Sequence, residues 1–425
     1  MPRVVPSLLI NPDHQTTHPY ETEPRLVDTH GNDFTLPDHD YNISQVRAAI
    51  PRHCYDRSAY RSLGYVVRDV AIFVGSCLMF ERFMTEWVIP WRSIRVVLKI
   101  FYVVLQSLNM TGLWVLGHEC GHGAFSTSDA LNDVVGYVLH SALLVPYFSW
   151  KISHRKHHKA TNNLSKDMGF VPNTKDHFLR NRHLSTIAEL SDETPLYTMF
   201  SLLQLQSTGW LVYLLTNATS HNQHERQKEG RGIGKSDGFL HGVNHFNSNS
   251  PIFDDKDKDK VHASNIGLLA TLAILMAVAY GYGWKLVAIH YFAPYLLLNN
   301  WIILITSMQH SDPSVPHYLP QSWNWSRGSA ATIDRDFGFI GRFFFHSIIE
   351  THVLHHHVST IPFYNAAEAS EAMKRVLGRH YRSDTRGGIV GYFKAMWMRI
   401  RLYHWVEPTS MKYQGVLFYK KRNSL

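Results

Sequence analysis

The stretch "ASNIGLLATLAILMAVAYGYGWKLVAIHYFAPYLLLNNWIILITS", residues 263–307, decides the fold class of this chain. It holds two apolar runs, 263–283 and 285–307, which meet at the short segment "GYGW". A helix needs about 20 predominantly apolar residues to cross a bilayer. Both runs reach that length, so the stretch predicts two transmembrane helices joined by a tight turn.

Further apolar segments lie upstream at 66–90, 94–117, 134–150 and 196–216. Residues 94–117 form another good candidate span. Residues 134–150 are too short to span, and we expect them to lie embedded in the membrane or at its interface. The weaker candidate 66–90 contains four charged residues, which must lie at the interfaces if it spans: Arg68, Asp69, Glu81 and Arg82.

The composition agrees with a membrane protein that has large aqueous parts. Apolar residues make up 45% of the 425 positions, and they gather in runs that alternate with polar, histidine-rich stretches. The formal charge of +8 suits anionic lipid headgroups or an acidic protein partner, and we expect no nucleic-acid partner. The three cysteines lie far apart and form no disulfide framework.

Three segments outside the apolar runs complete the organisation. Residues 1–60 contain no apolar core of signal-peptide length and are predicted to be a cytosolic tail. Residues 217–262 are polar, with "ERQKEGRGIGKSDG" and "DDKDKDK", and predict a solvated loop. Residues 392–405 mix basic residues with aromatics and methionine at helical spacing, which is typical of an interfacial helix or of an ordinary core helix.

Three histidine clusters carry the chemistry. Residues three or four positions apart share one face of a helix, so each cluster can direct its imidazoles at a common point. The clusters supply eight ring systems, in the segments "HECGH", "HRKHH" and "HVLHH": His118, His122, His154, His157, His158, His352, His355 and His356.

Ligand type and number indicate two metal ions. Imidazole suits zinc, copper, iron and nickel, but one zinc ion takes about four ligands, which is half of this set. Two irons would suit oxygen activation, and an all-nitrogen set differs from the glutamate-rich centres of soluble di-iron bundles. A competing interpretation is a zinc metalloprotease, because "HECGH" matches His-Glu-x-x-His with Glu119 as the general base. The other two clusters would then have no role. A non-catalytic membrane protein that stores metal also stays open.

Membrane geometry fixes the predicted topology. Clusters that share one site lie on one side of the membrane, so an even number of crossings separates any two of them. Residues 134–150 and 196–216 therefore cannot cross. The sequence predicts an all-α integral membrane protein with four transmembrane helices in two hairpins, interfacial helices, and a cytosolic cap that carries the histidines. Its predicted parts are the tail 1–60, a hairpin 61–117, a histidine-bearing region 118–262, a hairpin 263–307 and a cytosolic region 308–425.

With these three histidine boxes in this order, the chain resembles the membrane-bound fatty acid desaturases, and most of all the fungal oleate Δ12 (omega-6) acyl desaturases. The resemblance covers nearly all of the chain after residue 50. It rests on "GHECGHGAFS", "LLVPYFSWKISHRKHHKATNN", "LITSMQHSDPSVPHY", "ATIDRDFGFIGRFF", "ETHVLHHHVSTIPFYNAAEA", "WVEPT" and "GVLFY".

The resemblance implies an endoplasmic reticulum enzyme with a non-haem di-iron centre. Such an enzyme uses O₂ and two electrons, relayed from NADH through cytochrome b5 and its reductase, to insert a cis double bond into an acyl chain. The eight box histidines match the family's ligands. His310 in "SMQHSDP" matches a further ligand, although a histidine can also simply end a helix. We expect the four spans to enclose a narrow tunnel for the acyl chain.

Several positions depart from the pattern or extend it. Gly123 stands where many relatives carry His or Gln, and His357 is extra and faces away from its neighbours, so we exclude it from the ligand set. Glu119 and Glu350 are expected either to hydrogen-bond ligand imidazoles or to be solvated. Four cations around the second box are expected to dock an acidic cytochrome or to contact anionic lipid: Arg155, Lys156, Lys159 and Lys166.

The expected reaction is conversion of oleoyl to linoleoyl chains at the Δ12 position, on phospholipid. An ω3 (Δ15) desaturase, a bifunctional Δ12/ω3 desaturase or an acyl hydroxylase would keep every histidine. Regiochemistry depends on placement of the chain to about an ångström, which the boxes do not report.

Overall fold

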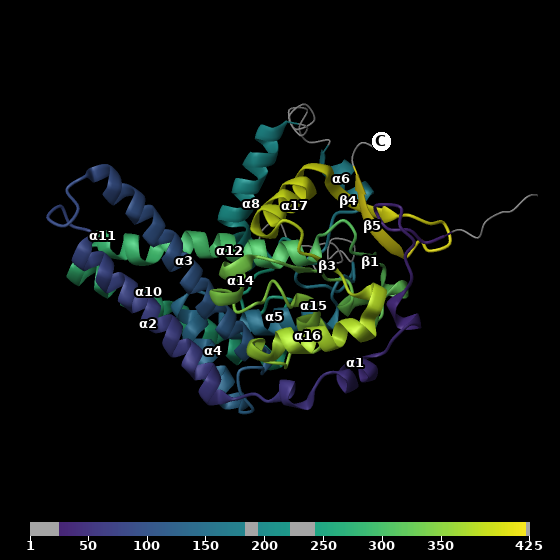
Figure 1. Cartoon of the computed structure of the whole chain (residues 1–425), viewed down its shortest axis with the longest axis horizontal. Coiled ribbons are helices and arrows are strands. Elements are labelled where there is room, and N and C mark those ends of the chain that lie inside the picture. The colour runs from purple at the N-terminus through teal and green to yellow at the C-terminus, as the bar shows by residue number, and fades with distance from the viewer. Residues whose placement is uncertain (1–24, 183–193, 222–242, 422–425) are drawn as a thin grey trace, which may run out of the picture.

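The computed structural model describes residues 25–182, 194–221 and 243–421, and Figure 1 shows their arrangement. The segment "ERQKEGRGIGKSDG" and the first 24 residues of the predicted tail lie outside these residues. The described chain is mostly helical, as the sequence predicts. The α-helices are α1 Ile43–Ala49, α2 Ala59–Phe83, α3 Arg92–His122, α4 Asp129–Ala142, α5 Tyr147–Lys159, α6 Lys175–Arg182, α8 Pro195–Thr216, α10 Lys258–Tyr282, α11 Trp284–Val287, α12 Ala293–His310, α13 Trp325–Ser329, α14 Gly338–Phe343, α15 His352–His357, α16 Phe363–Leu377 and α17 Gly388–Leu402.

Among the described residues, four segments are long and apolar enough to cross a membrane: Ala59–Phe83, Arg92–His122, Asp255–Tyr282 and Trp284–His310. They form the two predicted hairpins, and Gly283 makes the turn of the second with φ of +93°, a conformation that glycine adopts without strain. The last span is α11, a π-helical turn η5 (Ala288–Phe292) and α12 in continuous succession. The chain is therefore a multi-pass membrane protein.

The four spans differ in how much of each is covered by protein. In their most apolar windows, α2 and α10 are only 11% and 17% buried, whereas α3 and the α11–α12 span are each 44% buried. The outer helices α2 and α10 expose large apolar side chains such as Leu78 and Leu269. These surfaces suit lipid, and α3 and α12 are the inner helices that lead to the centre of the molecule.

The charges inside 66–90 are paired, which explains how α2 tolerates them. Asp69 is buried and accepts a 2.7 Å ion pair from Arg68 and a 2.9 Å contact from Nε2 of His346. Near the other end of α2, Glu81 lies 2.7 Å from Nε2 of His290. Charged groups in an apolar setting need such partners because the cost of desolvating them alone is high.

The two shorter apolar segments do not belong to the spans. Residues 134–150 form α4 and the start of α5, separated by a break at residues 143–146, and residues 196–216 form α8. Helix α8 packs along α12, with α17 against it, and exposes Phe200 and Leu203 on its outer face. Helix α17 likewise buries Tyr392 and Met396 while it exposes Val390. Both helices thus combine an exposed apolar face with a packed face.

The prediction of a solvated loop over residues 217–262 is wrong for its last residues. Residues 255–257 form the short helix η4 (Asp255–Asp257), and α10 begins at Lys258. The Asp254 side chain and the Asp257 side chain cap each other's backbone N–H groups reciprocally, and this arrangement starts a helix. The alternating charges therefore form the polar first turns of a span.

Small strands join segments that lie outside the spans. A three-stranded antiparallel sheet has the order β1 (His317–Tyr318), β5 (Val416–Lys421) and β4 (Tyr403–Pro408), and β2 (Asp334–Arg335) pairs in parallel with β3 (Ser383–Asp384). The sequence analysis did not predict these strands. In Figure 1 the labels of α2, α3, α10 and α11 lie at one end of the molecule and those of β1, β4 and β5 at the other. The remaining short helical turns are η1 Pro37–His39, η2 Arg52–Tyr55, η6 Pro320–Ser322 and η7 Gly378–His380.

Candidate metal centre

The histidine boxes lie where helices end near the centre of the molecule. His118 and His122 occupy the last turn and a half of α3, and His310 is the final residue of α12. The predicted boundary at residue 117 does not coincide with a helix end, because α3 runs on until Gly123 stops it in a left-handed conformation (φ +71°). Glycine in this conformation is a common helix stop. The two inner spans, α3 and α12, therefore each carry histidines of the candidate metal centre at one end. The second box lies on α5 and the third forms α15.

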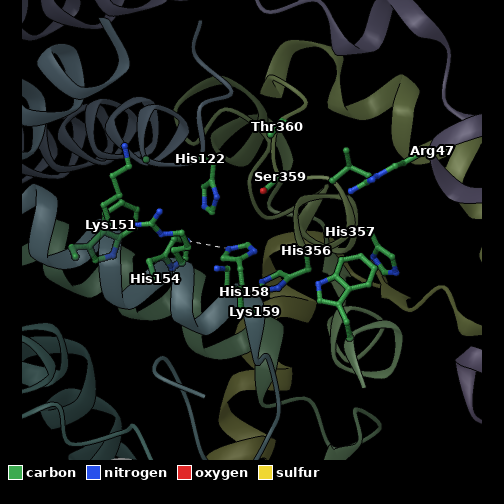
Figure 2. Close-up of a pocket in the computed structure, with 15 residues that line it drawn as sticks. Arg47, His122, Lys151, His154, His158, Lys159, His356, His357, Ser359 and Thr360 are labelled. Carbon is green, nitrogen blue, oxygen red and sulfur yellow. Dashed lines mark hydrogen bonds between the residues drawn. The ribbon is translucent and has the colours of Figure 1, made fainter. Parts of the chain in front are cut away.

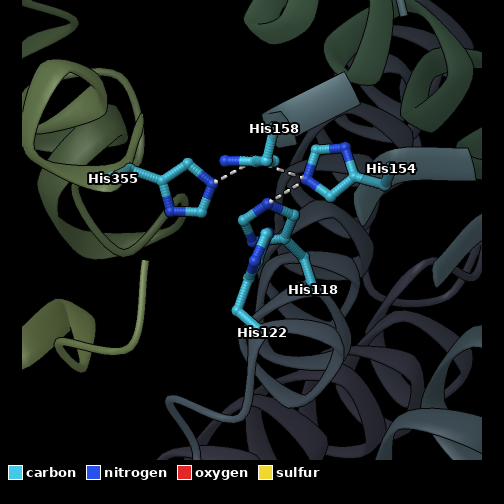
Figure 3. Close-up of side chains that lie close together, drawn as sticks. All are labelled: His118, His122, His154, His158 and His355. Atoms are coloured by element: carbon cyan, nitrogen blue, oxygen red, sulfur yellow. Dashed lines mark hydrogen bonds between the residues drawn. The ribbon is translucent and has the colours of Figure 1, made fainter. Parts of the chain in front are cut away.

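Five of these histidines converge on one point (Figure 3). Their candidate ligand atoms all lie within 4.8 Å of one another: His118, His122, His154, His158 and His355. Nε2 of His154 lies 3.1 Å from Nε2 of His118 and 3.2 Å from Nε2 of His158. Nε2 of His158 also lies 3.1 Å from Nε2 of His355. Three separate helices thus direct their imidazole nitrogens at the same volume.

The other four histidines form a second group beside the first. The candidate ligand atoms of His157, His310 and His356 lie within 4.8 Å of one another. His352 joins them, because its Nε2 lies 3.0 Å from Nε2 of His310 and 3.1 Å from Nε2 of His356. The nine predicted residues therefore separate into a set of five and a set of four.

The spacing of the nitrogens fits metal coordination. Two imidazole nitrogens that bind one ion at about 2.1 Å and at a right angle to each other lie about 3.0 Å apart. The observed separations of 3.0 to 3.2 Å match that value. Nε2 of His122 is buried without a hydrogen-bond partner, and a buried nitrogen of this kind calls for a ligand.

The protonation state of the clustered imidazoles also suits metal binding. Burial, together with the neighbouring imidazoles, holds the pKa values of His154, His158, His355 and His356 well below the usual range. Burial lowers the pKa of His352 to about 3, with a smaller contribution from His157. These rings are therefore neutral at physiological pH, which is the form that binds metal.

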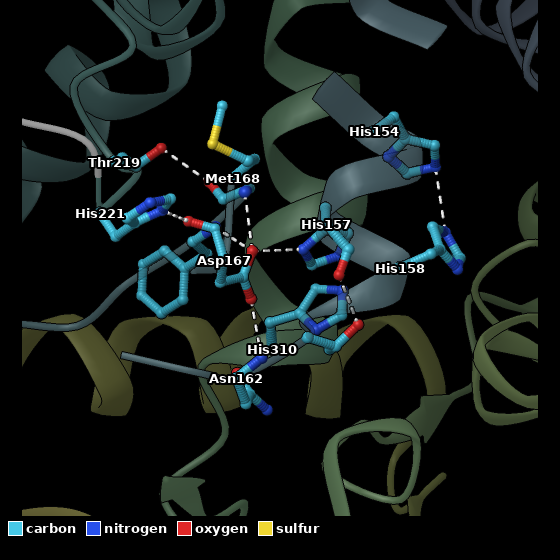
Figure 4. A network of polar contacts seen from close by, with 12 residues as sticks. His154, His157, His158, Asn162, Asp167, Met168, Thr219, His221 and His310 are labelled. Carbon is cyan, nitrogen blue, oxygen red and sulfur yellow. Dashed lines mark hydrogen bonds and ion pairs between the residues drawn. The ribbon is translucent and has the colours of Figure 1, made fainter. Parts of the chain in front are cut away.

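Asp167 is a residue of the centre that the sequence analysis missed. Its carboxylate is buried and lies 2.6 Å from Nδ1 of His157 (Figure 4). The same carboxylate accepts the backbone N–H groups of Asn162 and Gly169 at 2.7 and 2.8 Å. A carboxylate on one ring nitrogen fixes the tautomer and leaves the other nitrogen free for metal. The available signal was an aspartate ten residues after a box histidine, in a polar loop where many aspartates are solvated.

Replacement of Asp167 with asparagine should lower metal affinity by about 10- to 100-fold, the usual cost of losing a partner of a ligating histidine. The amide keeps the side-chain size but loses the charge that holds the His157 proton. The check is metal content after dialysis against a graded series of chelator concentrations. Asp336→Asn is a control, since Asp336 pairs with the exposed Arg342. Equal retention of metal by both variants would contradict this role for Asp167.

The two glutamates that were expected to hydrogen-bond ligand imidazoles or to be solvated have different surroundings. Glu119 is buried, with Oε1 3.7 Å from Nδ1 of His118 and Oε2 accepting the N–H of Phe363 at 3.1 Å. It therefore lies beside a box imidazole without a hydrogen bond to it. Oε1 of Glu350 accepts the N–H of Phe337 at 3.0 Å, so its hydrogen bond goes to the backbone and not to an imidazole.

His357 faces away from both groups. Its Nε2 lies 3.0 Å from the hydroxyl of Tyr41, and its Nδ1 lies 2.8 Å from the carbonyl oxygen of Val353. Burial lowers its pKa to about 4. Both nitrogens are engaged with other partners, and the exclusion of His357 from the ligand set stays a prediction.

An apolar cavity of about 350 Å³ reaches both histidine groups. Its walls come mainly from α8, α12 and α17, through side chains such as Leu205, Ile303 and Ile400. Its lining also includes Trp114 and Trp150 and five of the nine histidines: His118, His154, His157, His310 and His352. The sequence predicted a tunnel enclosed by the four spans. This cavity instead lies between the inner spans and helices α8 and α17.

A second hollow of about 300 Å³ also reaches the histidines (Figure 2). It is lined by His122, His154, His158 and His356, and by four cations: Arg47, Lys151, Arg155 and Lys159. Two of the predicted docking cations, Arg155 and Lys159, therefore lie at this opening. Lys156 donates to the carbonyl oxygen of Ile252 at 2.6 Å, and Lys166 is exposed outside this lining.

Comparison with known proteins agrees with the geometry. A family model described as fatty acid desaturase matches residues 95–387, which include all nine histidines, and one described as a domain of unknown function matches residues 20–77. An oleate hydroxylase of Claviceps purpurea is 51% identical over 405 residues, or 94% of this chain and 84% of that protein. A Δ12 fatty acid desaturase of Mortierella alpina is 36% identical over 91% of this chain and 92% of its own length.

A third relative is an omega-6 fatty acid desaturase of Glycine max, described as an endoplasmic reticulum isozyme. It is 38% identical over 90% of this chain and 92% of its own length. The match of the family model covers well over half of the chain, and the residues that it covers are those that build the two histidine groups on the inner spans. The chain is a member of the fatty acid desaturase family.

Proposed function

We propose that the protein is a Δ12 acyl desaturase that converts oleoyl chains, carried on phospholipid, into linoleoyl chains. The observation that carries this proposal is the apolar cavity that touches both histidine groups. A cavity lined by aliphatic and aromatic side chains takes an acyl chain, and the histidines in its wall place that chain beside the metals. The Mortierella alpina relative, named as a Δ12 desaturase, and the Glycine max relative, named as an omega-6 desaturase, support the position of the double bond.

In this proposal the metals are two irons, held by the group of five and the group of four histidines. When bound, the irons supply the O₂-derived oxidant that removes hydrogen from an unactivated methylene. The protein positions the chain and keeps the site dry. Four helices, α3, α5, α12 and α15, and the buried carboxylate of Asp167 fix the imidazoles, and the apolar walls of α8, α12 and α17 exclude water.

The zinc protease interpretation has less support. A protease base must face a solvent-accessible substrate, but Glu119 is only 3% exposed and accepts the N–H of Phe363. The pair His118 and His122 also lies within a set of five imidazoles rather than alone. Metal analysis of the purified chain separates the cases: about two irons support the desaturase. One zinc, with peptide cleavage lost in Glu119→Ala, would support the protease.

In desaturation one –CH₂–CH₂– unit, one O₂, two electrons and two protons react to give –CH=CH– and two waters. The electrons would come from NADH through a cytochrome b5 reductase and cytochrome b5. The hollow lined by Arg47, Lys151, Arg155 and Lys159 supports docking of an acidic cytochrome close to His122 and His158. Complementary charge of this kind steers association and fixes orientation.

Hydroxylation of the oleoyl chain is the second candidate, because the 51% identical relative is an oleate hydroxylase. That reaction uses the same O₂, electrons and protons but gives one C–OH group and one water. It needs the same histidines and a similar cavity, with a different placement of the chain. An ω3 or bifunctional Δ12/ω3 desaturase would differ in the same way.

Expression in a yeast that makes oleate but no polyunsaturated fatty acids tests the proposal directly. We expect linoleate to appear in the phospholipid fraction, as measured by gas chromatography of methyl esters. A trienoic product in addition would show ω3 activity. A hydroxy acid as the main product would replace the Δ12 proposal by the hydroxylase.

We also propose an endoplasmic reticulum location with both histidine groups facing the cytosol. In this topology residues 1–60 and 308–425 are cytosolic, residues 61–117 and 263–307 include the hairpins, and residues 118–262 lie at the cytosolic surface. The name of the Glycine max relative supports the compartment. Protease protection of an epitope inserted at the α2–α3 turn, with intact microsomes, tests the orientation.

A further inference from the structure

A third group of metal-ligating side chains lies outside the histidine boxes. His53 and Cys54 belong to the short helix η2, and Glu368 lies on α16. Their candidate ligand atoms lie within 4.8 Å of one another. Nε2 of His53 lies 2.9 Å from Oε2 of Glu368 and 3.7 Å from Sγ of Cys54. Two segments more than 300 positions apart in the chain thus bring a nitrogen, a sulfur and an oxygen together.

The donor set is of the kind that binds zinc. Zinc takes imidazole nitrogen at about 2.0 to 2.1 Å, thiolate sulfur at about 2.3 Å and carboxylate oxygen at about 2.0 to 2.2 Å. In a tetrahedral site these bond lengths place the nitrogen about 3.6 Å from the sulfur, close to the 3.7 Å separation here. The His53 and Glu368 side chains are 59% and 58% exposed, so an ion can reach these two side chains from solvent, whereas Cys54 is buried beside them.

We propose that His53, Cys54 and Glu368 form a cation site of zinc type that is separate from the histidine boxes. The protein supplies three ligands and water supplies the fourth. Binding displaces the thiol proton of Cys54 to solvent, so that a thiolate, a neutral imidazole and a carboxylate coordinate the ion. Burial and the nearby carboxylates of Glu368 and Asp56 raise the pKa of the Cys54 thiol, and a bound cation overcomes this effect.

The position of the site gives it a structural consequence. Cys54 is fully buried in an apolar cluster that also contains Ile50, Met373 and two residues of the third box helix α15, Val353 and Leu354. An ion at the site would therefore tie the segment 51–56 to α16, which packs directly against α15. The site therefore involves residues that pack behind the helix of the third histidine box, and it includes none of the histidines of that box.

Titration of the purified, iron-loaded full chain with Co²⁺ alone tests the proposal. Cobalt bound to a thiolate gives a charge-transfer absorption in the near ultraviolet, and none of the nine histidine ligands proposed for the irons is a thiol. We expect about one additional cobalt per chain with this absorption. The absorption does not depend on desaturase activity. The test of this cation site is therefore independent of the test of the proposed function.

The variants separate this site from other cysteines and histidines. Cys54→Ser should remove the absorption, and Glu368→Gln should weaken cobalt binding by at least about tenfold, since loss of even an indirect partner costs that much. Cys77→Ser, Cys120→Ser and His39→Gln should leave both signals unchanged. Because Cys54 is buried, the exposed Glu368→Gln variant keeps the test valid even if Cys54→Ser fails to fold. Absence of the absorption in the unaltered chain, or unchanged binding in Glu368→Gln, would overturn the proposal.

Discussion

Replacement of His355 with alanine is expected to abolish product formation and to remove metal from the centre. Nε2 of His355 lies 3.1 Å from Nε2 of His158, and its ring packs against those of His118 and His122. It is the only member of the group of five that α15 contributes. Loss of an indirect partner already lowers metal affinity by about 10- to 100-fold, so loss of a direct ligand should exceed that. Fatty-acid analysis in yeast and iron analysis of the purified chain measure the two effects.

The matched control is two positions away. His357→Ala removes an imidazole of equal size from the same helix, but His357 contacts Tyr41 and the carbonyl oxygen of Val353. We expect this variant to keep its iron and most of its activity, and to lose stability by about 1 to 3 kcal/mol because buried partners are left unsatisfied. If His357→Ala lost both irons while His355→Ala kept them, the assignment of the two residues would be reversed.

A leucine at Gly209 is expected to lower turnover of oleoyl chains by about 100-fold without loss of iron. Gly209 lies on α8 in the wall of the apolar cavity. A Cβ atom there would already come within 3.2 Å of the side chains of Ile303 and Leu205, so a longer side chain must enter the cavity or displace Ile303. A displacement of the substrate by about an ångström can cost that factor in rate.

Gly75→Leu is the control for this change. Gly75 lies on α2, and a Cβ atom there would meet no other atom within 4 Å. The substitution adds the same side chain to a helix of the membrane region but leaves the cavity untouched. Rates are compared at equal amounts of iron-loaded protein in the same membranes. Equal activity of the two variants would show that the acyl chain does not occupy the cavity between α8, α12 and α17.

The sequence predicted the hairpins and the histidine boxes because both are local signals. An apolar run of about 20 residues is decided by its own composition, and histidines three or four positions apart share a helix face whatever surrounds them. His310 was predicted through family resemblance, and the structure places it within reach of His157, His352 and His356. The parity of membrane crossings then excluded 134–150 and 196–216 as spans, in agreement with the helices that meet the span criteria.

Other features depend on contacts between distant segments. The cavity walls include α8, which packs along α12, and α17, whose Tyr392 hydroxyl donates to the carbonyl oxygen of Leu304 on α12, and no local pattern encodes these contacts. The strand β1 has only two residues and exists because residues 416 and 417 pair with it. Asp167 was missed because its loop folds back onto His157 through the turn that begins at Asn162. Such features follow from packing, which single-sequence patterns do not report.

The division of ligands between the two hairpins has a consequence for how the protein is made. The first hairpin ends in His118 and His122, the second in His310, and α15 follows only after residue 351. During synthesis the first hairpin enters the membrane with two histidines and cannot complete either group. Neither group is complete until the last box has left the ribosome, because His355 belongs to the group of five and His352 and His356 belong to the group of four. The proposed iron centre is therefore completed only after insertion of both hairpins, and we expect a chain truncated before residue 352 to be recovered from membranes with less metal than the full chain.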